Sequence, residues 1–398
     1  MRIRTQIPEP QHEANQTVRV EIGTAKGTQS MRVSFKDQRL TAYGGLVTWT
    51  RFLHEQGVRG LLGRTLPHRP TSPNAYAPAD IALGFIGGIV SGADKLSRVA
   101  WLQSDRAVAE VLGIEAVPSQ STLSRFFGVC TQGACEGLSR LHGWAARQLP
   151  SRREGYTLDL DSTALVHEDG HQAGVRVGFT KQGLKPCHKP LVAALAETPL
   201  IANYWLRRGD THCVNNAAPF LAQTLARLPS QVRVTLLRAD SGFCATAFLA
   251  AVEHHGLRFI VAQALRRPVQ RLCRHHAEAW TATEIPGVSV QETSDPEYPD
   301  RRLIVVRQEL TERPRAGGKV LLELPGYRFQ ALLTNLPAST SPLEVWRRYN
   351  GRADVENRIK TGLRGHALHG DIKISGEISA GLQLETPNLN FPFPTQPK

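Results

Sequence analysis

The distribution of apolar and polar residues divides the chain into a helical part and a part in which strands and helices alternate. In residues 40–150, apolar side chains recur at helical spacing, as at Leu46, Trp49, Phe52, Leu53 and Leu61. From Tyr156 onward, the apolar residues come in short runs, which is typical of buried strands. The pattern therefore predicts a helical N-terminal region followed by an α/β domain.

Within the helical part, Pro- and Ser-rich residues 67–78 predict a loop, and helices are expected over 81–90 and 105–112. Residues 118–127 predict a turn followed by a capped helix. The hydroxyl groups of that segment and Arg125 have two interpretations. They contact phosphates, as helix N-termini do, or they only cap the helix.

The α/β part has a definite order of elements. Strands are expected over 156–165, 175–179, 190–205, 232–237 and 258–263, and helices over 216–228 and 246–255. Three leading strands followed by helix, strand, helix and strand form a ribonuclease-H-like arrangement, although periodicity alone establishes only the α/β class. After residue 266, Pro-rich turns and short strands predict a β-rich insertion, and a strong helix is expected over 343–363.

The charge balance points to a polyanionic partner. The chain has 48 Lys and Arg against 35 Asp and Glu, a net charge of +13. Nucleic acid is the commonest partner of such a protein, and a basic soluble enzyme is the alternative. The six cysteines form no CxxC pair, no signal-peptide pattern is present, and no apolar run approaches the ~20 residues of a membrane span. We therefore expect a cytoplasmic protein with reduced thiols and no membrane partner.

Candidate chemistry begins with acids at strand ends. Asp240 follows the apolar run 232–237, where a buried strand meets its loop, and that crevice binds ligands in open α/β sheets. The alternative is that Asp240 only caps the following helix. Asp159 and Asp161 lie on an earlier strand, and alternation places both on the same face. Carboxylates side by side must share a proton or hold a metal.

The late helix supplies a third acid. Tyr349, Arg352, Glu356 and Lys360 are spaced three, four and four residues apart, so they lie on one stripe of a helix. The alternative is a solvated face with i,i+4 pairing. Three acids with no cysteine or histidine cage suit two Mg²⁺ or Mn²⁺ ions, which stabilise the attacking and leaving oxygens of a phosphoryl displacement. The nucleophile is then water or a DNA 3′-hydroxyl.

Together these segments resemble the DDE transposases of bacterial insertion sequences, DDE domain group one, in the superfamily marked by a Tyr-Arg-Glu helix. The resemblance covers about residues 40–362. It rests on Asp159-Leu-Asp161-Ser-Thr, His188-Lys-Pro-Leu191, Arg238-Ala-Asp240-Ser-Gly-Phe243, Thr334-Asn335 and the helix that carries Tyr349, Arg352, Glu356 and Lys360.

The resemblance implies that Asp161, Asp240 and Glu356 are the catalytic metal ligands. Asp161 is preferred to Asp159 because the family acid usually precedes a small residue and a threonine. Tyr349 and Arg352 are expected to contact the phosphate at the transposon end. The family's later basic residue would fall at Leu363 here, so Lys360 or Arg364 must substitute for it.

The domain organisation follows from the pattern and the resemblance. We expect a flexible basic arm (1–39), a helical DNA-binding region (40–150), the first part of a ribonuclease-H-like core (151–265), a β-rich insertion (266–335), the catalytic helix that completes the core (336–364) and a disordered or aberrant tail (365–398). The Pro- and Asn-rich end of the chain suits neither helix nor central strand. It predicts a frameshift or truncation beyond Glu356 and a poorly active or inactive chain, with a natural disordered tail as the alternative.

The expected function is a Mg²⁺-dependent DNA transposase that cuts and joins double-stranded DNA at terminal inverted repeats, with a homodimer in the DNA complex. Two alternatives remain at this point. One is a DNA-binding remnant that recognises element ends without catalysis. The other is a metal-dependent nuclease of the same fold that does not join strands.

Overall fold

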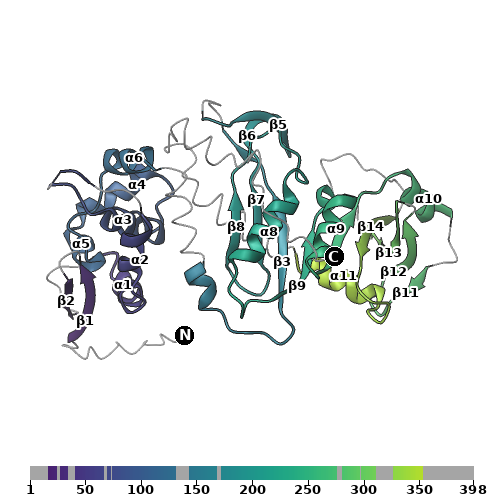
Figure 1. The fold of residues 1–398 in the computed structure, drawn as a ribbon, viewed down its shortest axis with the longest axis horizontal. Helices are drawn as coiled ribbons and strands as arrows, with labels where there is room; N and C mark the ends of the chain where they lie inside the picture. The colour runs from purple at the N-terminus through teal and green to yellow at the C-terminus, as the bar shows by residue number, and fades with distance from the viewer. Residues whose placement is uncertain are drawn as a thin grey trace, which may run out of the picture. The chain divides into compact units, whose positions relative to one another are not determined.

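The computed structural model describes residues 17–24, 27–34, 41–66, 70–72, 74–130, 143–167, 172–275, 280–295, 297–310 and 326–352. These residues fall into two compact units, one up to residue 130 and one from residue 143 (Figure 1). Each unit buries its own apolar side chains. None of the helices in the described ranges has the length and apolar character needed to cross a membrane.

The first unit begins with a β-hairpin. Strand β1 (Thr17–Thr24) pairs antiparallel with β2 (Gly27–Ser34). A flexible arm was expected over residues 1–39, and these two strands correct that expectation. The signal is the alternation of apolar and polar residues over 18–22, which has the period of a strand. Ile22 is buried, and β1 lies against the first helix.

Helices make up the rest of the first unit. They are α1 (Leu46–Glu55), α2 (Val58–Thr65), α3 (Pro78–Val90), α4 (Leu96–Trp101), α5 (Arg106–Leu112) and α6 (Gln120–Gly128), with the 3₁₀ turn η1 (Leu102–Ser104) after α4. Side chains cap two of them: Asp105 accepts from the backbone N–H of Ala107, and Ser119 accepts from that of Thr122. The helix predicted over 81–90 starts three residues earlier, because Pro78 is favoured in a first turn.

The second unit is built on a nine-stranded mixed sheet. Its strands are β3 (Tyr156–Ser162), β7 (Leu191–Leu195), β8 (Ile201–Trp205), β9 (Val234–Ala239), β10 (Arg258–Gln263), β11 (Thr281–Ala282), β12 (Val288–Asp295), β13 (Tyr298–Glu309) and β14 (Tyr327–Thr334). Their order is β11-β12-β13-β14-β10-β9-β3-β7-β8, and the strands that Figure 1 labels, which are all of these except β10, follow this order across the unit. Strands β3, β9 and β10 are parallel, and every other neighbouring pair is antiparallel.

Helices cover both faces of this sheet. On one face, α8 (Ala217–Arg227), α9 (Thr246–His254) and α10 (Arg267–His275) bury a core that includes Leu158, Leu160 and Leu237. On the other face, α11 (Pro342–Asn350) packs over β10 and β12–β14. Because side chains alternate along a strand, residues next to Leu158, Leu160 and Leu237 in sequence point to the α11 side.

A small sheet is inserted between β3 and β7. It contains β4 (Leu165–Val166), β5 (Arg176–Thr180) and β6 (Gly183–His188), in the order β4-β6-β5. The strand predicted over 156–165 therefore ends at Ser162, and the segment predicted as 190–205 divides into β7 and β8 with a turn between them. The strand predicted over 258–263 is confirmed with the same bounds.

Residues 266–335, expected as a β-rich insertion, contribute β11–β14 to the main sheet, because β14 pairs with β10 and carries β13, β12 and β11 with it. The helix expected over 343–363 ends at Asn350, and Gly351 and Arg352 form a turn. Residues from 353 onward, including the expected tail over 365–398, lie outside the described residues.

Candidate active site

The register of two parallel strands brings Asp161 and Asp240 to the same level. In the β3–β9 pair, Leu160 lies opposite Ala239, so Asp161 and Asp240 occupy the next position on each chain. Both are at the carboxyl end of their strand, and neighbouring strands lie ~4.8 Å apart. The ligand-binding crevices of open α/β sheets lie at such ends. The two acids that were predicted from different segments are therefore brought together here.

Asp240 is fixed by the turn that follows it. Its backbone is extended, and its Oδ1 accepts a 3.0 Å hydrogen bond from the backbone N–H of Gly242 in the 3₁₀ turn η2 (Ser241–Phe243). A Cβ at Gly242 would lie 2.2 Å from the Cys213 sulfur, so only glycine fits there. Burial raises the pKa of the Cys213 thiol, and the charge of Asp240 adds to that shift. The thiol beside Asp240 is therefore protonated at neutral pH.

Asp159 has a different environment from Asp161. Its side chain is fully buried (0% exposed) and is bound by Arg238, whose Nε and Nη2 each donate to one carboxylate oxygen at 2.6 Å. Burial raises the pKa of Asp159, and the hydrogen bonds and charge of Arg238 act in the opposite direction. The third guanidinium nitrogen, Nη1, donates to the backbone carbonyl of Arg348 in the last turn of α11. The pair therefore joins β3, β9 and α11.

Asp161 faces the end of the same helix. Nη2 of Arg352 donates to Asp161 Oδ1 at 2.9 Å and to the backbone carbonyl of Leu160 at 3.1 Å. Arg352 is 5% exposed, while the Asp161 side chain is 16% exposed. The carboxylate at the strand end is thus partly open to solvent, with its negative charge balanced by a buried guanidinium.

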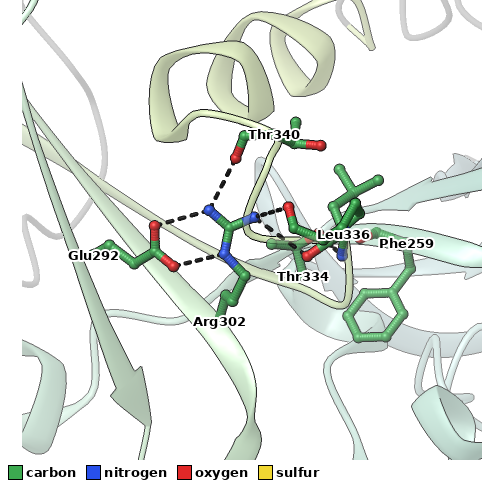
Figure 2. Close-up of polar contacts among 7 residues, drawn as sticks. Phe259, Glu292, Arg302, Thr334, Leu336 and Thr340 are labelled. Atoms are coloured by element: carbon green, nitrogen blue, oxygen red, sulfur yellow. Dashed lines mark hydrogen bonds and ion pairs between the residues drawn. The ribbon is translucent and has the colours of Figure 1, made fainter.

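Arg302 holds the start of α11 (Figure 2). Its guanidinium forms two hydrogen bonds with Glu292, at 2.6 and 2.8 Å. It also donates to the carbonyls of Leu336 and Pro337, at 3.2 and 2.8 Å, and to that of Thr340 at 2.9 Å. Arginines from β13 and β9 therefore bind the segment before α11 and its last turn, respectively.

Arg207 is a residue of this region that the sequence analysis missed. It is buried and donates to Ser162 Oγ at 3.2 Å and to the carbonyl of Lys189 at 3.0 Å. It also donates to the carbonyls of His212 and Asn215, which flank Cys213. Burial lowers the pKa of Arg207 to about 10, so it stays protonated at neutral pH. Its only sequence signal is a cation two residues beyond a buried strand.

Of the other residues predicted for the site, the structure describes Tyr349. Tyr349 is 8% exposed and belongs to the core between α11 and the sheet. Glu356 and Lys360 lie outside the described residues, as does Arg364. Among the residues that the structure describes, no three His, Cys, Asp or Glu side chains are grouped as a metal centre. The His254–His255 rings lie against each other, and no third ligand is grouped with them in the part of the chain that the structure describes.

A cavity of about 600 Å³ lies away from these acids. Its lining includes Arg258, Arg302 and Asn335. Arg258 begins β10, and in the parallel register it lies level with Leu236 rather than with Asp240. Asn335 there bonds the backbone of Phe259 and Leu257, which is a structural role. The cavity is therefore at the opposite edge of the parallel strands from Asp161 and Asp240.

The fold and these acids define an α/β protein with a carboxylate pair at the carboxyl edge of a mixed sheet. Over residues 24–368 the chain matches the family Transposase DDE domain group 1, and it belongs to that family. The resemblance seen in the sequence is thereby confirmed. The protein is a transposase, from a family of metal-dependent enzymes that cut nucleic acid, bind DNA at transposon ends and recombine DNA. No curated protein sequence matches the chain.

Proposed function

We propose that this protein cuts and joins double-stranded DNA at terminal inverted repeats, with two divalent ions held by Asp161, Asp240 and Glu356. The observation that carries the proposal is the level placement of Asp161 and Asp240 at the ends of adjacent parallel strands. Family membership supports it. In the DNA complex, a homodimer would bring two transposon ends together.

The strand order supports a ribonuclease-H-like core. Three antiparallel strands, β3, β7 and β8, are followed by α8, the parallel strand β9, α9 and the parallel strand β10. The sequence pattern predicts a similar succession, but its second leading strand, 175–179, is β5 of the small sheet, and its third, 190–205, divides into β7 and β8. The added strands β11–β14 extend the β10 edge and carry the chain to α11.

Asp161, rather than Asp159, is the first metal ligand in this proposal. A metal ligand must offer its oxygens to an ion that also reaches DNA. Both oxygens of Asp159 are engaged by Arg238, and the side chain is closed to solvent. Asp161 is partly exposed and lies level with Asp240. Asp159 instead holds Arg238 in position.

The donor set fits Mg²⁺ or Mn²⁺. Hard divalent ions take carboxylate oxygens, which both aspartates supply, and the thiol of Cys213 beside them is protonated and a poor ligand. When bound, two such ions stabilise the attacking and leaving oxygens of an in-line phosphoryl displacement. In the absence of ions, the N–H of Gly242 holds the carboxylate of Asp240 and the guanidinium of Arg352 holds that of Asp161.

DNA contacts are assigned to Arg352 and Lys360. Tyr349, which the resemblance assigns to the same phosphate, is buried between α11 and the sheet and would have to leave that core to reach DNA. Arg352 would reach a phosphate by exchanging its contact with Asp161 for one with DNA, which frees the carboxylate for the ion. In the first unit, Arg125 at α6 and the capped start of that helix would bind DNA phosphates. The net charge of +13 supports such binding.

The test compares Asp161→Asn and Asp240→Asn with wild type on duplex DNA taken from either flank of the coding region. Each variant should lose Mg²⁺-dependent cleavage while keeping DNA binding, because the basic surface is unchanged. Asp300→Asn is the matched control, since Asp300 is exposed on β13 and remote from the strand ends. Cleavage at the wild-type rate in Asp240→Asn would overturn the assignment.

The reaction products distinguish the transposase from a DNA-binding remnant and from a nuclease. Binding of the flanking DNA without cleavage by the wild-type chain would identify a DNA-binding remnant. Cleavage without joined products would identify a nuclease. Cleavage followed by strand transfer into a target duplex is the outcome expected of the transposase.

A further inference from the structure

The β5–β6 hairpin exposes an apolar face beside the candidate active site. Phe179 and Leu184 lie opposite each other in this hairpin and are 72% and 73% exposed, more than any other large apolar side chain among the described residues. Val177, also exposed, lies on the same face as they do, opposite Pro186. Burying such a surface is favourable, so a cluster left in water marks a surface that binds something.

The hairpin is held rigidly in this position. A Cβ at Gly178 would lie 1.9 Å from the carbonyl oxygen of Gly209, so the inner face of β5 is pressed against the backbone of that loop. At its base, His188 Nδ1 and His167 Nε2 are hydrogen-bonded at 2.9 Å, and both rings are buried. The outer face therefore stays exposed because the inner face is anchored.

The charged side chains of the hairpin and of the residues beside it are all basic. Residues 172–189 contain Arg176, Lys181, Lys185 and Lys189 and no Asp or Glu. Two observations argue against a protein partner. The core of a protein–protein interface is depleted in charged residues such as lysine. A specific interface also buries ~1,000 Å² or more, which three apolar side chains do not supply. A polyanion with exposed ring faces fits both the charge and the apolar cluster.

The hairpin starts and ends at the edge of the sheet that carries the acids. The chain leaves β3 at Ser162, directly after Asp161, and returns to β7 at Leu191, which pairs with Ser162. Arg207 joins the two ends by donating to Ser162 and to the carbonyl of Lys189. Strands β5 and β6 project beyond β7 in Figure 1. DNA bound at the acids would therefore meet this hairpin.

We propose that the β5–β6 hairpin is a DNA wedge, in which Phe179 and Leu184 contact unstacked bases while Lys181, exposed in the turn between the two strands, binds a flanking phosphate. The inference rests on the proposed function, because it requires the acids to act on DNA. Apolar side chains that enter a base step part the bases and kink the duplex. A wedge beside the reacting phosphate would open the helix at the point of cleavage.

The experiment measures binding of Phe179→Ala to duplex DNA from the flanks of the coding region, with and without an internal mismatch. A stacked aromatic contact contributes roughly 5- to 150-fold in affinity per base. Wild type should bind the mismatched duplex more tightly, because the unstacking cost is lower there. The variant should bind both duplexes more weakly and lose that preference. Phe179→Tyr, which keeps a ring of similar shape, should retain it.

A fluorescent base analogue placed beside the mismatch gives an independent readout. It should brighten on binding wild type and stay quenched with Phe179→Ala, since unstacking raises its emission. Lys181→Gln should reduce the salt slope of binding by about 1, whereas Phe179→Ala should leave it unchanged. Thermal unfolding should be the same for Phe179→Ala, Phe179→Tyr and Lys181→Gln, because the side chains replaced are exposed.

The outcomes separate this proposal from the one on which it rests. If wild type binds and cuts DNA but Phe179→Ala keeps its affinity and mismatch preference, the wedge is overturned and the transposase assignment stands. If Phe179→Ala converts a dimer to a monomer in the absence of DNA, the face binds a second copy and the wedge is likewise overturned. If wild type binds no DNA at all, both proposals fail.

Discussion

Arg238 and Asp159 form a buried bidentate ion pair, with two nitrogen–oxygen distances of 2.6 Å. The two residues lie opposite each other in the parallel register of β9 and β3. Arg238 also donates to the carbonyl of Arg348, which belongs to α11. The pair is therefore the point at which the strands of Asp161 and Asp240 are joined to the helix that precedes Glu356.

Replacing one member of this pair should be strongly destabilising. Arg238→Met leaves the Asp159 carboxylate buried without its partner, and we expect the free energy of unfolding to fall by about 3–5 kcal/mol. The double variant Asp159→Leu/Arg238→Met should recover most of that loss, because it removes the buried charge. It should not recover DNA cleavage, since the contact with Arg348 is still missing. Denaturant unfolding and a cleavage assay measure the two quantities separately.

The pH dependence of Arg238→Met provides the check. Burial raises the pKa of Asp159, and the variant loses the hydrogen bonds and charge that oppose this shift. The pKa of Asp159 is then higher in the folded chain than in the unfolded chain, where it is about 3.9. The free energy of unfolding therefore falls as the pH rises from the unfolded pKa to the folded pKa. The deficit of the variant should therefore shrink toward pH 4. A deficit that grows at acid pH would show that the carboxylate is not the source of the destabilisation.

Gly351→Ala tests how closely α11 approaches this pair. A Cβ at Gly351 would lie 2.8 Å from Nη1 of Arg238, which cannot move freely because it is bound to the Arg348 carbonyl. We expect a loss of about 1–3 kcal/mol in stability and a larger relative loss of cleavage, because the chain leading to Glu356 is displaced. Gly143→Ala is the control, as its Cβ would make only an ordinary 3.6 Å contact. Equal cleavage by both variants would contradict the prediction.

Asp161 and Asp240 could be predicted from the sequence because the strand pattern and the side-chain chemistry indicate the same positions. Apolar runs that end in Asp161 and Asp240 predict carboxylates at strand ends, and the register places them level. The alternation of side chains along the strand could not show which of Asp159 and Asp161 is the metal ligand, since both lie on one face. The two aspartates differ in their contacts, because strand pairing brings Arg238, 79 positions away in sequence, opposite Asp159.

The sequence alone could predict neither where α11 ends nor that β14 pairs with β10, because both depend on contacts between distant parts of the chain. The spacing of Tyr349 and Arg352 fits a continuing helix, but the chain turns at Gly351, where Arg238 occupies the space beside it. Short strands after residue 266 were visible as a pattern. Which edge they pair with depends on long-range backbone hydrogen bonds that no local pattern encodes.

Arg302→Lys should loosen the other end of α11. A lysine can keep one contact with Glu292 but lacks the planar fork that binds Leu336, Pro337 and Thr340 at the same time (Figure 2). Losing even one hydrogen bond to a charged group costs about 1.5–3 kcal/mol. We expect a destabilisation of this size, together with faster amide exchange over residues 336–342. Arg328→Lys, at an exposed position of β14, should change neither.

Arg352→Gln examines whether Asp161 is a metal ligand. The guanidinium of Arg352 lies 2.9 Å from Asp161 Oδ1, so it competes with a cation for that carboxylate. Opposite charges about 4 Å apart interact by roughly 1–4 kcal/mol at a protein surface, which corresponds to about fivefold or more in affinity. The variant should therefore bind Mn²⁺ at least about fivefold more tightly in the absence of DNA, as measured by electron paramagnetic resonance. It should nevertheless cut DNA poorly, because Arg352 also holds the Leu160 carbonyl.

Two further variants decide the origin of any gain in Mn²⁺ affinity. Arg347→Gln removes an exposed arginine of the same helix that pairs with Glu284, so a general change of charge would raise affinity equally in that control. In the double variant Asp161→Asn/Arg352→Gln the gain should vanish, because the ligand whose charge was released is gone. If Mn²⁺ binds Arg352→Gln no more tightly than wild type, or if the gain survives removal of Asp161, the carboxylate at the end of β3 does not hold the metal. The assignment would then have to pass to another acid.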